Sequence, residues 1–422
     1  MLSALLEVVG LALCGYVGVL VLADAYLIVV HFRSGSRRIA QELPESLGWA
    51  APSEREPLVC VQLPVFNEGN LVGPAIDSLC ALDWPHDRLE IMILEDSTDE
   101  TSAIVARSVA QWRANGFAIK HVTRPHRRDF KAGALSAGLR HTRAQYLAIF
   151  DADYRPPPSF LRNTMSALLS EPRSAFVQAR LDYRNRQHNL LTRAQALDLD
   201  TLLAYEQAAR NWAGIPMTFN GTCGIWRREA IEEAGGWSGR SLAEDQDLSF
   251  RAFALGWRSR YLISVSAKGE LPETFDALIT QRQRWSIGTA QAFRDLPWRL
   301  LGQLHWHQAV VFVLLTLFYA SASATLVIVL AIVGIGWLAE FTYAGVVSLG
   351  LLATVVAIVV AKSIGAALAT RILGRPLGMA FARDVVGMWL MQAALLPIGS
   401  RALLVGYITR RVPFFRTPKK GH

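Results

Sequence analysis

Two carboxylates, Asp151 and Asp153, directly follow the apolar run of residues 146–150. Such a run predicts a buried central strand, and open α/β sheets bind ligands where their strands end. Two acids at positions i and i+2 can bind one divalent cation if the chain turns there, and hard cations with oxygen ligands serve diphosphate chemistry. An Asp-x-Asp pair alone is a weak signal, so the predicted metal site depends on what neighbouring strands contribute.

The elements that position these acids form a repeated pattern of strands and helices from about residue 52. Short apolar runs predict four strands, and the stretches between them predict three helices. The strands are expected at 58–63, 89–94, 117–122 and 146–150, and the helices at 71–82, 100–115 and 132–142. Units of this length imply a parallel sheet with right-handed crossovers, and therefore an α/β fold.

Candidate binding residues, most of them polar, follow each of the four predicted strands. In chain order they are Pro64, Asn67 and Glu68, then Asp96, then the basic cluster 124–128 with Lys131, and last Asp151 and Asp153. Each set also has a structural explanation, such as a helix start, a helix cap at Ser97 or a solvated loop. Because parallel strands end at one edge, we expect the four sets to meet in one crevice and bind a nucleotide diphosphate.

The run 218–226 contains Gly221 and Gly224, which allow the backbone to approach a ligand closely. Four tryptophans follow in this half of the chain, and their flat faces suit sugar rings or, equally, a hydrophobic core. They are Trp226, Trp237, Trp257 and Trp285. Their positions leave both interpretations open.

Several acids lie close together between residues 241 and 247. Ser241 and Glu244 have the spacing of a capping box, which would give Glu244 a structural role. Asp247 suits the first turn of the same helix through its dipole. Asp245 is least explained by capping, so we predict that it is the general base.

Gln281, Arg284 and Trp285 stand at i, i+3 and i+4, which places them on one face of a predicted helix. The Arg284 guanidinium can bind a diphosphate as a fork, and the Trp285 ring can stack on an acceptor sugar. Alternatively, the helix lies beside the membrane and uses Arg and Trp as headgroup anchors. Spacing alone does not separate the two.

The composition predicts a soluble domain flanked by membrane spans, because 52% of the 422 residues are apolar and 18% are charged. Tracts at 8–32, 309–338 and 343–368 are long enough to cross a bilayer. Basic residues from Arg33 to Arg38 place the end of the first span in the cytoplasm. The stretch 379–408, with a helix-breaking Pro397, predicts interfacial helices, although a fourth span is an alternative.

The predicted domains are therefore an N-terminal span at 1–38, a cytosolic catalytic domain at 39–300, transmembrane and interfacial helices at 301–409 and a basic tail at 410–422. The excess of 43 basic over 35 acidic residues lies largely beside spans, where it suits anionic lipid rather than nucleic acid. The four scattered cysteines lack metal-ligand spacing and predict reduced, structural thiols.

In their order along residues 58–295, these motifs resemble those of membrane-embedded family 2 glycosyltransferases, most closely the cellulose-synthase-like A group that makes mannan and glucomannan. The matching motifs are Val61-Gln62-Leu63-Pro64 with Asn67-Glu68, Glu95-Asp96-Ser97-Thr98-Asp99, Lys131-Ala132-Gly133-Ala134-Leu135, Phe150-Asp151-Ala152-Asp153, Phe219-Asn220-Gly221-Thr222, Gly224-Ile225-Trp226-Arg227, Glu233-Ala234-Gly235-Gly236-Trp237, Glu244-Asp245, Glu270-Leu271-Pro272, and Gln281 with Arg284-Trp285. The resemblance implies a GT-A fold, a Rossmann-like mixed sheet.

The resemblance also implies roles for residues. Asp96 would contact the nucleotide, Asp151 and Asp153 would bind the diphosphate through Mg²⁺ or Mn²⁺, and Asp245 would be the base. The tail resembles the Phe-x-Val-Thr-x-Lys gating loop of cellulose synthases through Phe414, Thr417 and Lys419, with Arg416 where valine is usual. The expected nucleotide-sugar-binding residues are Pro64, Asn67, Glu68, Asp96, Lys131, Asp151, Gln281, Arg284, Phe414, Thr417 and Lys419, and the acceptor-binding residues are Trp285, Trp226, Asn220, Gly221 and Glu244.

The expected function is that of an inverting hexosyltransferase that moves a sugar from GDP-mannose or UDP-glucose to a growing β-linked polysaccharide. The alternative is a lipid glycosyltransferase that makes a monoglycosyl diacylglycerol or ceramide. The polymer-extruding relatives have more spans after the gating loop, which puts a channel made from one chain in doubt and leaves a homo-oligomer open. We expect a bacterial inner membrane or its equivalent as the location, with the catalytic domain in the cytosol.

Overall fold

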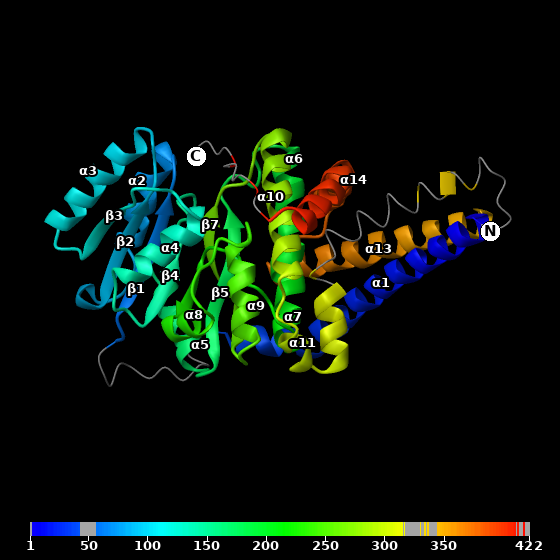
Figure 1. Cartoon of the computed structure of the whole chain (residues 1–422), viewed down its shortest axis with the longest axis horizontal. Helices are drawn as coiled ribbons and strands as arrows, with labels where there is room; N and C mark the ends of the chain where they lie inside the picture. The colour runs from blue at the N-terminus through cyan, green and yellow to red at the C-terminus, as the bar shows by residue number, and fades with distance from the viewer. Residues whose placement is uncertain are drawn as a thin grey trace.

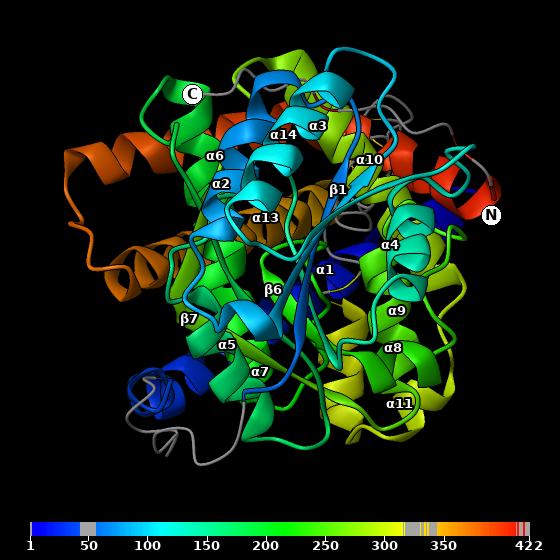
Figure 2. The same cartoon turned by 90° about the vertical axis from the view of Figure 1, so that its left-hand side faces the viewer.

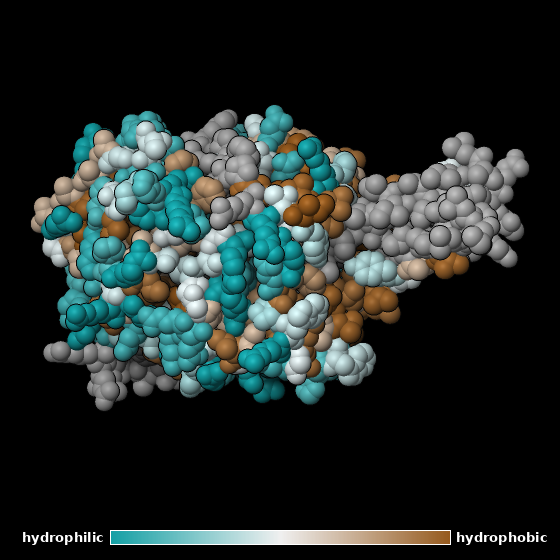
Figure 3. All heavy atoms as spheres, viewed as in Figure 1, coloured by the Kyte–Doolittle hydropathy of each residue, from teal (hydrophilic) through white to brown (hydrophobic). Residues whose placement is uncertain are grey.

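A computed structural model describes residues 2–42, 56–314 and 344–410, together with 316, 330, 333, 334, 336, 412 and 417. A domain built around one sheet occupies one end of the molecule, and the long helices α1 (Leu2–Ala40) and α13 (Ala344–Ile372) extend from it side by side (Figure 1). Hydrophobic residues gather where these two helices leave the domain, whereas the visible face of the domain is largely hydrophilic (Figure 3).

The sheet has seven strands in the order β3-β2-β1-β4-β6-β5-β7. The strands are β1 (Val59–Val65), β2 (Leu89–Glu95), β3 (Ile119–Thr123), β4 (Tyr146–Ile149), β5 (Ser174–Tyr183), β6 (Gly224–Arg227) and β7 (Arg258–Gly269). The first four pair in parallel, β6 is antiparallel to both β4 and β5, and β5 pairs in parallel with β7. The predicted α/β class is confirmed, and the sheet is mixed, as the family resemblance implied.

The remaining helices include those that cover the two faces of this sheet. They are η2 (Gly69–Leu71), α2 (Val72–Cys80), η3 (His86–Arg88), α3 (Thr101–Ala114), α4 (Phe130–Arg140), α5 (Phe160–Leu169), α6 (Leu190–Asp200), η4 (Thr201–Gln207), α7 (Ala208–Trp212), α8 (Arg228–Glu233), α9 (Glu244–Phe253), α10 (Phe275–Arg294), α11 (Arg299–Gly302) and α14 (Met379–Ile408). Viewed from the end of the domain, α2 and α5 lie on one side of the strands and α4, α8 and α9 on the other (Figure 2). Both faces of the sheet are covered, which explains why the central strands β1, β2 and β4 are buried almost throughout and do not alternate.

The strand order places a topological switch at the edge where the acids emerge. From β1 the chain winds through β2 to β3, then returns to place β4 on the opposite side of β1. Ligands bind in open α/β sheets at such a reversal, because the loops after the two adjacent strands diverge and leave a crevice. The loop after β1 and the loop carrying Asp151 and Asp153 flank this crevice.

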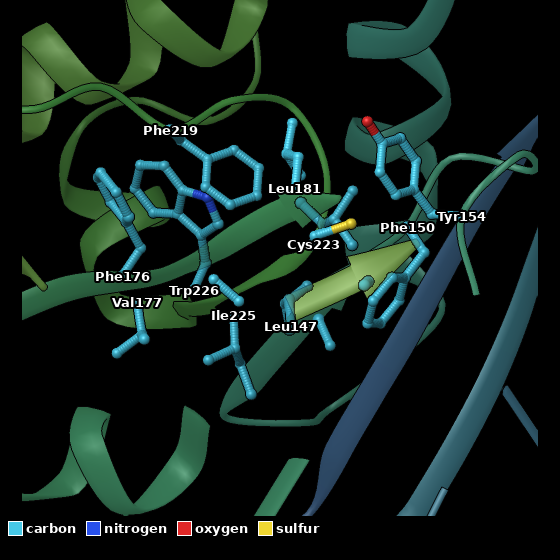
Figure 4. Packing of buried hydrophobic residues seen from close by; sticks show 14 of the residues in the cluster. Leu147, Phe150, Tyr154, Phe176, Val177, Leu181, Phe219, Cys223, Ile225 and Trp226 are labelled. Atoms are coloured by element: carbon cyan, nitrogen blue, oxygen red, sulfur yellow. The ribbon is translucent and has the colours of Figure 1, made fainter. Parts of the chain in front are cut away.

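Aromatic side chains from β5, β6 and the loop before β6 pack into the core beside this edge. Trp226 is fully buried, and its ring lies 4.5 Å from that of Phe176 and 5.6 Å from that of Phe219, centroid to centroid. Figure 4 shows the indole among Phe176, Phe219 and Ile225. Trp237 and Trp257 are buried as well, so these three tryptophans belong to the core.

Within the described residues, three helices are long and apolar enough to cross a membrane, judged by length and composition. Their candidate spans are Gly18–Ala40, Val355–Ile372 and Met379–Ile408. The predicted span at 309–338 falls mostly outside the described residues. The predicted span at 343–368 corresponds to α13, and the predicted first span lies within α1.

The stretch 379–408 forms one 30-residue helix, α14, which contains Pro397. The expectation that Pro397 separates two helices is therefore wrong. Figures 1 and 2 together show α14 running across the direction of α1 and α13. It packs on α10 and α6, and Nε and Nη2 of Arg193 donate to the Asp384 carboxylate at 3.0 and 3.2 Å. This packing explains the helix, because tertiary contacts outweigh the one hydrogen bond that a proline removes.

Cys60, Cys80 and Cys223 are free and buried, in agreement with the predicted structural thiols. Burial raises the pKa of Cys60 and of Cys80 to about 12. These thiols therefore stay protonated and unreactive at neutral pH.

Candidate active site

A cleft of about 400 Å³ opens at the carboxyl ends of β1, β2 and β4. Most of the candidate residues line it. These are Pro64, Glu68, Asp96, Lys131, Asp151, Asp153, Asn220, Gly221, Glu244, Asp245, Gln281, Arg284, Trp285 and Thr417. Arg127, from the loop after β3, lines the same cleft. The prediction that four strand ends meet in one crevice is therefore confirmed.

The remaining candidate residues fall into three groups. Trp226 is fully buried in the core and does not contribute to the cleft, so its expected place at the acceptor was wrong. Asn67 joins two loops, because its amide oxygen accepts from the Thr98 backbone N–H at 2.8 Å and its own N–H donates to Ser97 Oγ at 3.0 Å. Phe414 and Lys419 lie outside the described residues.

Asp96 holds the basic loop that follows β3. Its two carboxylate oxygens accept from Nε and Nη2 of Arg124 in a bidentate pair. Nη1 of Arg124 donates to the carbonyl of Arg128 at 2.9 Å, and Nη2 also donates to that of Phe130 at 3.0 Å. The Arg127 guanidinium then lies over the Phe66 ring, 3.4 Å from its centroid. Asp96 therefore fixes the loop that brings Arg127 and Lys131 to the cleft.

Lys131 links three parts of the site. Its ammonium donates to Asp151 Oδ1 and, at 2.8 Å, to the carbonyl of Gly221. Burial opposes its charge, but Asp151, Glu244 and Asp245 outweigh this effect and raise the pKa of Lys131. Lys131 is therefore a fixed positive charge beside Asp151 in the cleft.

Glycine is required at position 221 both by the backbone conformation and by the neighbouring side chains. Its φ is +76°, and a Cβ there would lie 3.1 Å from Asp245 Oδ2 and 3.5 Å from Lys131 Nζ. A side chain would therefore intrude between the candidate base and the lysine. The glycine leaves this space to a ligand.

Asp151 and Asp153 suit a divalent cation that also binds the substrate. Both line the cleft, the Asp151 side chain is 37% exposed, and Asp153 Oδ2 accepts from the Glu270 N–H at 3.4 Å. Within the described residues no group of three or more His, Cys, Asp and Glu is arranged to hold a metal. Two carboxylates fit Mg²⁺ or Mn²⁺, because such ions usually complete their shell with phosphate oxygens and water.

Asp245 and Glu244 begin α9, facing the cleft. Ala243 is the N-cap and Ser241 Oγ donates to the Gly288 carbonyl at 2.8 Å, so the capping-box interpretation of Ser241 and Glu244 is wrong. Burial and the neighbouring Glu244 charge raise the pKa of Asp245 to about 7. Burial likewise raises the pKa of Glu244. A carboxylate with a pKa near neutrality is well suited to accept a proton.

The end of the cleft nearest α14 is formed by α10. Gln281, Arg284 and Trp285 all line the cleft, as their predicted position on one helix face implies. Burial lowers the pKa of Arg284, although the nearby carboxylates, Asp151 first among them, oppose this shift. Trp285 is 38% exposed, and the Arg282 guanidinium lies 5.0 Å from the ring. Trp285 therefore offers an open aromatic face.

Sequence reasoning missed a group of polar residues at the inner end of the cleft, on η4 and α7. Gln207 and Asn220 exchange two amide hydrogen bonds of 2.9 and 3.0 Å. Glu206 and Arg210 line the cleft as well, with a 3.7 Å ion pair between them. The i,i+4 spacing of this pair is that of a common surface ion pair, so the sequence carried no signal that it is buried.

Several known proteins resemble this chain in sequence or in fold. Residues 146–355 match the family model described as glycosyl transferase family group 2. The chain is 41% identical over 249 residues to glucomannan 4-beta-mannosyltransferase 9 of Arabidopsis thaliana, an alignment that covers 58% of this chain and 47% of that protein. It is 43% identical over 248 residues to glucomannan 4-beta-mannosyltransferase 2 of the same plant, covering 58% and 46% respectively.

The fold resembles that of a mannosyltransferase from Pyrobaculum calidifontis solved in complex with GDP-Man and Mn²⁺. The TM-score is 0.62, the sequence identity is 20%, and the match covers 96% of this chain and 100% of that one. The chain spans slightly less than half the length of the curated relatives it matches. These comparisons establish that the chain contains a glycosyltransferase family 2 domain with a GT-A fold.

Proposed function

We propose that this chain, because it contains a family 2 glycosyltransferase domain, transfers a hexose with inversion from a nucleotide sugar to a growing β-linked polysaccharide. The observation that carries the proposal is the half-buried Asp245 carboxylate, with a pKa of about 7, in the same cleft as Asp151, Asp153 and Arg284. One base and one stabilised leaving group are what a single inverting displacement requires. The comparisons give no support to a lipid acceptor.

The proposed reaction is one displacement at the anomeric carbon. The acceptor hydroxyl oxygen bonds to that carbon, the bond from carbon to the diphosphate oxygen breaks, and Asp245 takes the hydroxyl proton. Lys131 and Arg284 stabilise the charge that develops on the departing diphosphate. A divalent cation bound by Asp151 and Asp153 would supply further charge neutralisation when present.

GDP-mannose is the donor that we propose first, and Mn²⁺ or Mg²⁺ the metal. Both curated relatives are named as mannosyltransferases, and the archaeal protein of similar fold was solved with GDP-Man and Mn²⁺. UDP-glucose is the competing donor. Pro64, Glu68 and Asp96 would contact the nucleotide, whereas Asn67 would act indirectly by joining the two loops beside it.

The acceptor is proposed to lie against Trp285, with Asn220, Gly221 and Glu244 around its reacting end. Thr417 also lines the cleft and is 6% exposed, which supports a place for this residue beside the nucleotide. Residues 39–300 are proposed to face the cytosol, because Arg33, Arg37 and Arg38 close the first candidate span. In this arrangement α14 lies in the membrane surface.

Product analysis tests the proposal. The full chain, purified in lipid, is given radiolabelled GDP-mannose or UDP-glucose with Mn²⁺, and the product is sized before and after digestion. We expect high-mass label from GDP-mannose that β-mannanase releases, and none from the Asp245→Asn variant. Label confined to an organic-soluble lipid carrying one sugar would overturn the polysaccharide proposal, and β-glucanase-sensitive polymer from UDP-glucose would reassign the donor.

A further inference from the structure

A second cavity, of about 480 Å³, lies beside the cleft and shares a wall with it. Arg127, Phe130, Lys131, Leu242 and Glu244 line both spaces. The other arginines of the lining are Arg128, Arg240 and Arg410, which come from three distant parts of the chain. We call this space the basic cavity and define it by Arg127, Arg128, Arg240, Arg410 and Gln291.

The walls of the basic cavity are built rather than formed by loose side chains. The loop carrying Arg127 and Arg128 is held by the two carbonyl contacts of Arg124. The opposite loop packs directly on it at Gly239, where a Cβ would lie 2.6 Å from that of Asp129. The two arginine-bearing loops therefore keep a fixed separation.

The floor is equally well fixed. Gln291 of α10 is 1% exposed, accepts from the Leu242 N–H at 2.9 Å and donates to the Thr409 carbonyl at 3.1 Å. These bonds tie the segment before α9 to the end of α14, where Arg410 follows. The basic groups of three chain segments are thus brought together by hydrogen bonds that involve the buried Gln291 side chain and the Arg124 guanidinium.

Positive charge outweighs negative charge in this cavity. Its ionisable lining consists of Arg127, Arg128, Lys131, Arg240 and Arg410 against Asp129 and Glu244. The acidic contacts are weak on this side, since Arg128 meets Asp129 only at 3.8 Å, and Arg240 meets Asp247 at 3.5 Å while Arg251 binds Asp247 at 2.7 Å. Converging guanidinium groups are a general solution for binding phosphate.

We propose that the basic cavity binds a second phosphate-bearing ligand, separate from the donor nucleotide in the cleft. The ligand class is a phosphate or diphosphate group, carried either by a soluble nucleotide or by a phospholipid headgroup. No metal is required in the basic cavity, because its arginines are themselves positively charged. Asp151 and Asp153 in the cleft are negatively charged and need a cation between them and a phosphate.

The position of the basic cavity gives such a ligand access to the donor site. Arg124 binds Asp96 in the cleft and the carbonyl of Arg128 in the cavity wall. Lys131 lines both spaces and bonds Asp151. An anion in the cavity would therefore contact the loop that positions the nucleotide-binding residues.

Pyrophosphate is the probe for a direct binding test that needs no transfer activity. The full chain, in phosphatidylcholine nanodiscs with EDTA, is titrated calorimetrically. We expect one metal-free binding event that the cleft variant Arg284→Ala retains. Arg128→Ala and Arg240→Ala, both at exposed side chains, should each weaken it about tenfold or more. Arg107→Ala, an exposed arginine on α3, serves as the control and should keep wild-type affinity.

Absence of metal-free binding would overturn the proposal, as would weaker binding in Arg284→Ala with unchanged binding in Arg128→Ala and Arg240→Ala. Nanodiscs that contain phosphatidylglycerol identify the source of the phosphate. Weaker pyrophosphate binding in them assigns the cavity to a lipid headgroup, and unchanged binding assigns it to a soluble phosphorylated ligand. Because the readout is binding, a failure here is distinguishable from a failure of the proposed transfer reaction.

Discussion

Two adjacent carboxylates, Glu244 and Asp245, stand at the start of α9. Both are half-buried, and the charge of Glu244 disfavours that of Asp245. Lys131 lies close enough to lower both pKa values, but not enough to cancel the effect of burial. The pair therefore holds a proton more readily than two isolated acids would, and Asp245 ionises near neutral pH.

The Asp245→Asn variant is expected to lose sugar transfer by about 10²-fold to 10⁴-fold, the usual contribution of a positioned base. The amide occupies the same volume and accepts no proton, so donor binding should be retained. Single-turnover transfer and calorimetric nucleotide binding are the two measurements. Loss of both together would mean that Asp245 serves nucleotide binding rather than proton transfer.

Replacing Glu244 tests the origin of the Asp245 pKa. Wild-type kcat/KM should rise with pH through about 7 as Asp245 ionises. Glu244→Gln removes the neighbouring negative charge, so this limb of the profile should move to lower pH, while burial still keeps the pKa above its ordinary value. The exposed Glu229→Gln on α8 is the matched control. A midpoint that stays in place in Glu244→Gln would exclude the proposed repulsion.

Asp245 should also be a source of instability above neutral pH. Its pKa rises from 3.8 to about 7 on folding, so its contribution to stability is fully present below about pH 4 and is lost as the pH rises through 7. Asp245→Asn cannot ionise, and its melting temperature should exceed that of the wild type increasingly between these limits. Equal melting temperatures at pH 8 would show that the charged carboxylate is not penalised in the folded state.

At the scale of elements, the strands were predictable and the contacts of single residues were not. The strand expected at 89–94 is observed at Leu89–Glu95, because a buried parallel strand is a continuous apolar run that the sequence displays directly. The start of α9 and the continuity of α14 through Pro397 depend on packing against α10, which lies far away in sequence. The amino-acid pattern within one segment does not predict its contacts with segments that are distant in sequence.

Trp226 and Trp285 illustrate the same limit, since one is fully buried and the other is 38% exposed. Trp226→Ala should lower the free energy of unfolding by about 3–5 kcal/mol, as for other large core truncations. Trp285→Ala should keep the fold and reduce kcat/KM for a soluble β-linked oligosaccharide by about two- to tenfold. Denaturant titration and acceptor kinetics separate the two variants, and normal stability of Trp226→Ala would contradict its core position.

At the scale of the whole molecule, a buried ion cluster connects the long helices to the domain. Lys362 of α13 donates to Asp24 of α1 at 2.9 Å and to Glu206 of η4 at 3.2 Å. The Asp24 and Glu206 side chains are 2% and 5% exposed. The neighbouring Gln207 bonds Asn220, which precedes the Gly221 carbonyl that accepts from Lys131. Together these contacts form a connected path from α13 to the candidate active site.

Lys362→Met should therefore destabilise the fold by about 3–5 kcal/mol, because it leaves the buried Asp24 carboxylate without its cation. Glu206 keeps its ion pair with Arg210, so the double variant Asp24→Asn with Lys362→Met should recover most of the loss. Thermal unfolding in a fixed lipid mixture is the measurement. A double variant no more stable than Lys362→Met would show that the damage arises from lost packing.

The same cluster sets an order of events during biosynthesis. Asp24 leaves the ribosome 338 residues before Lys362, a delay on the order of 20–70 s at the usual rate of about 5–20 residues per second. An acid in a membrane-crossing helix costs about 2.5–3.5 kcal/mol while it has no partner. A first helix that crosses the bilayer would therefore hold Asp24 there without its lysine partner until more than four fifths of the chain has been made.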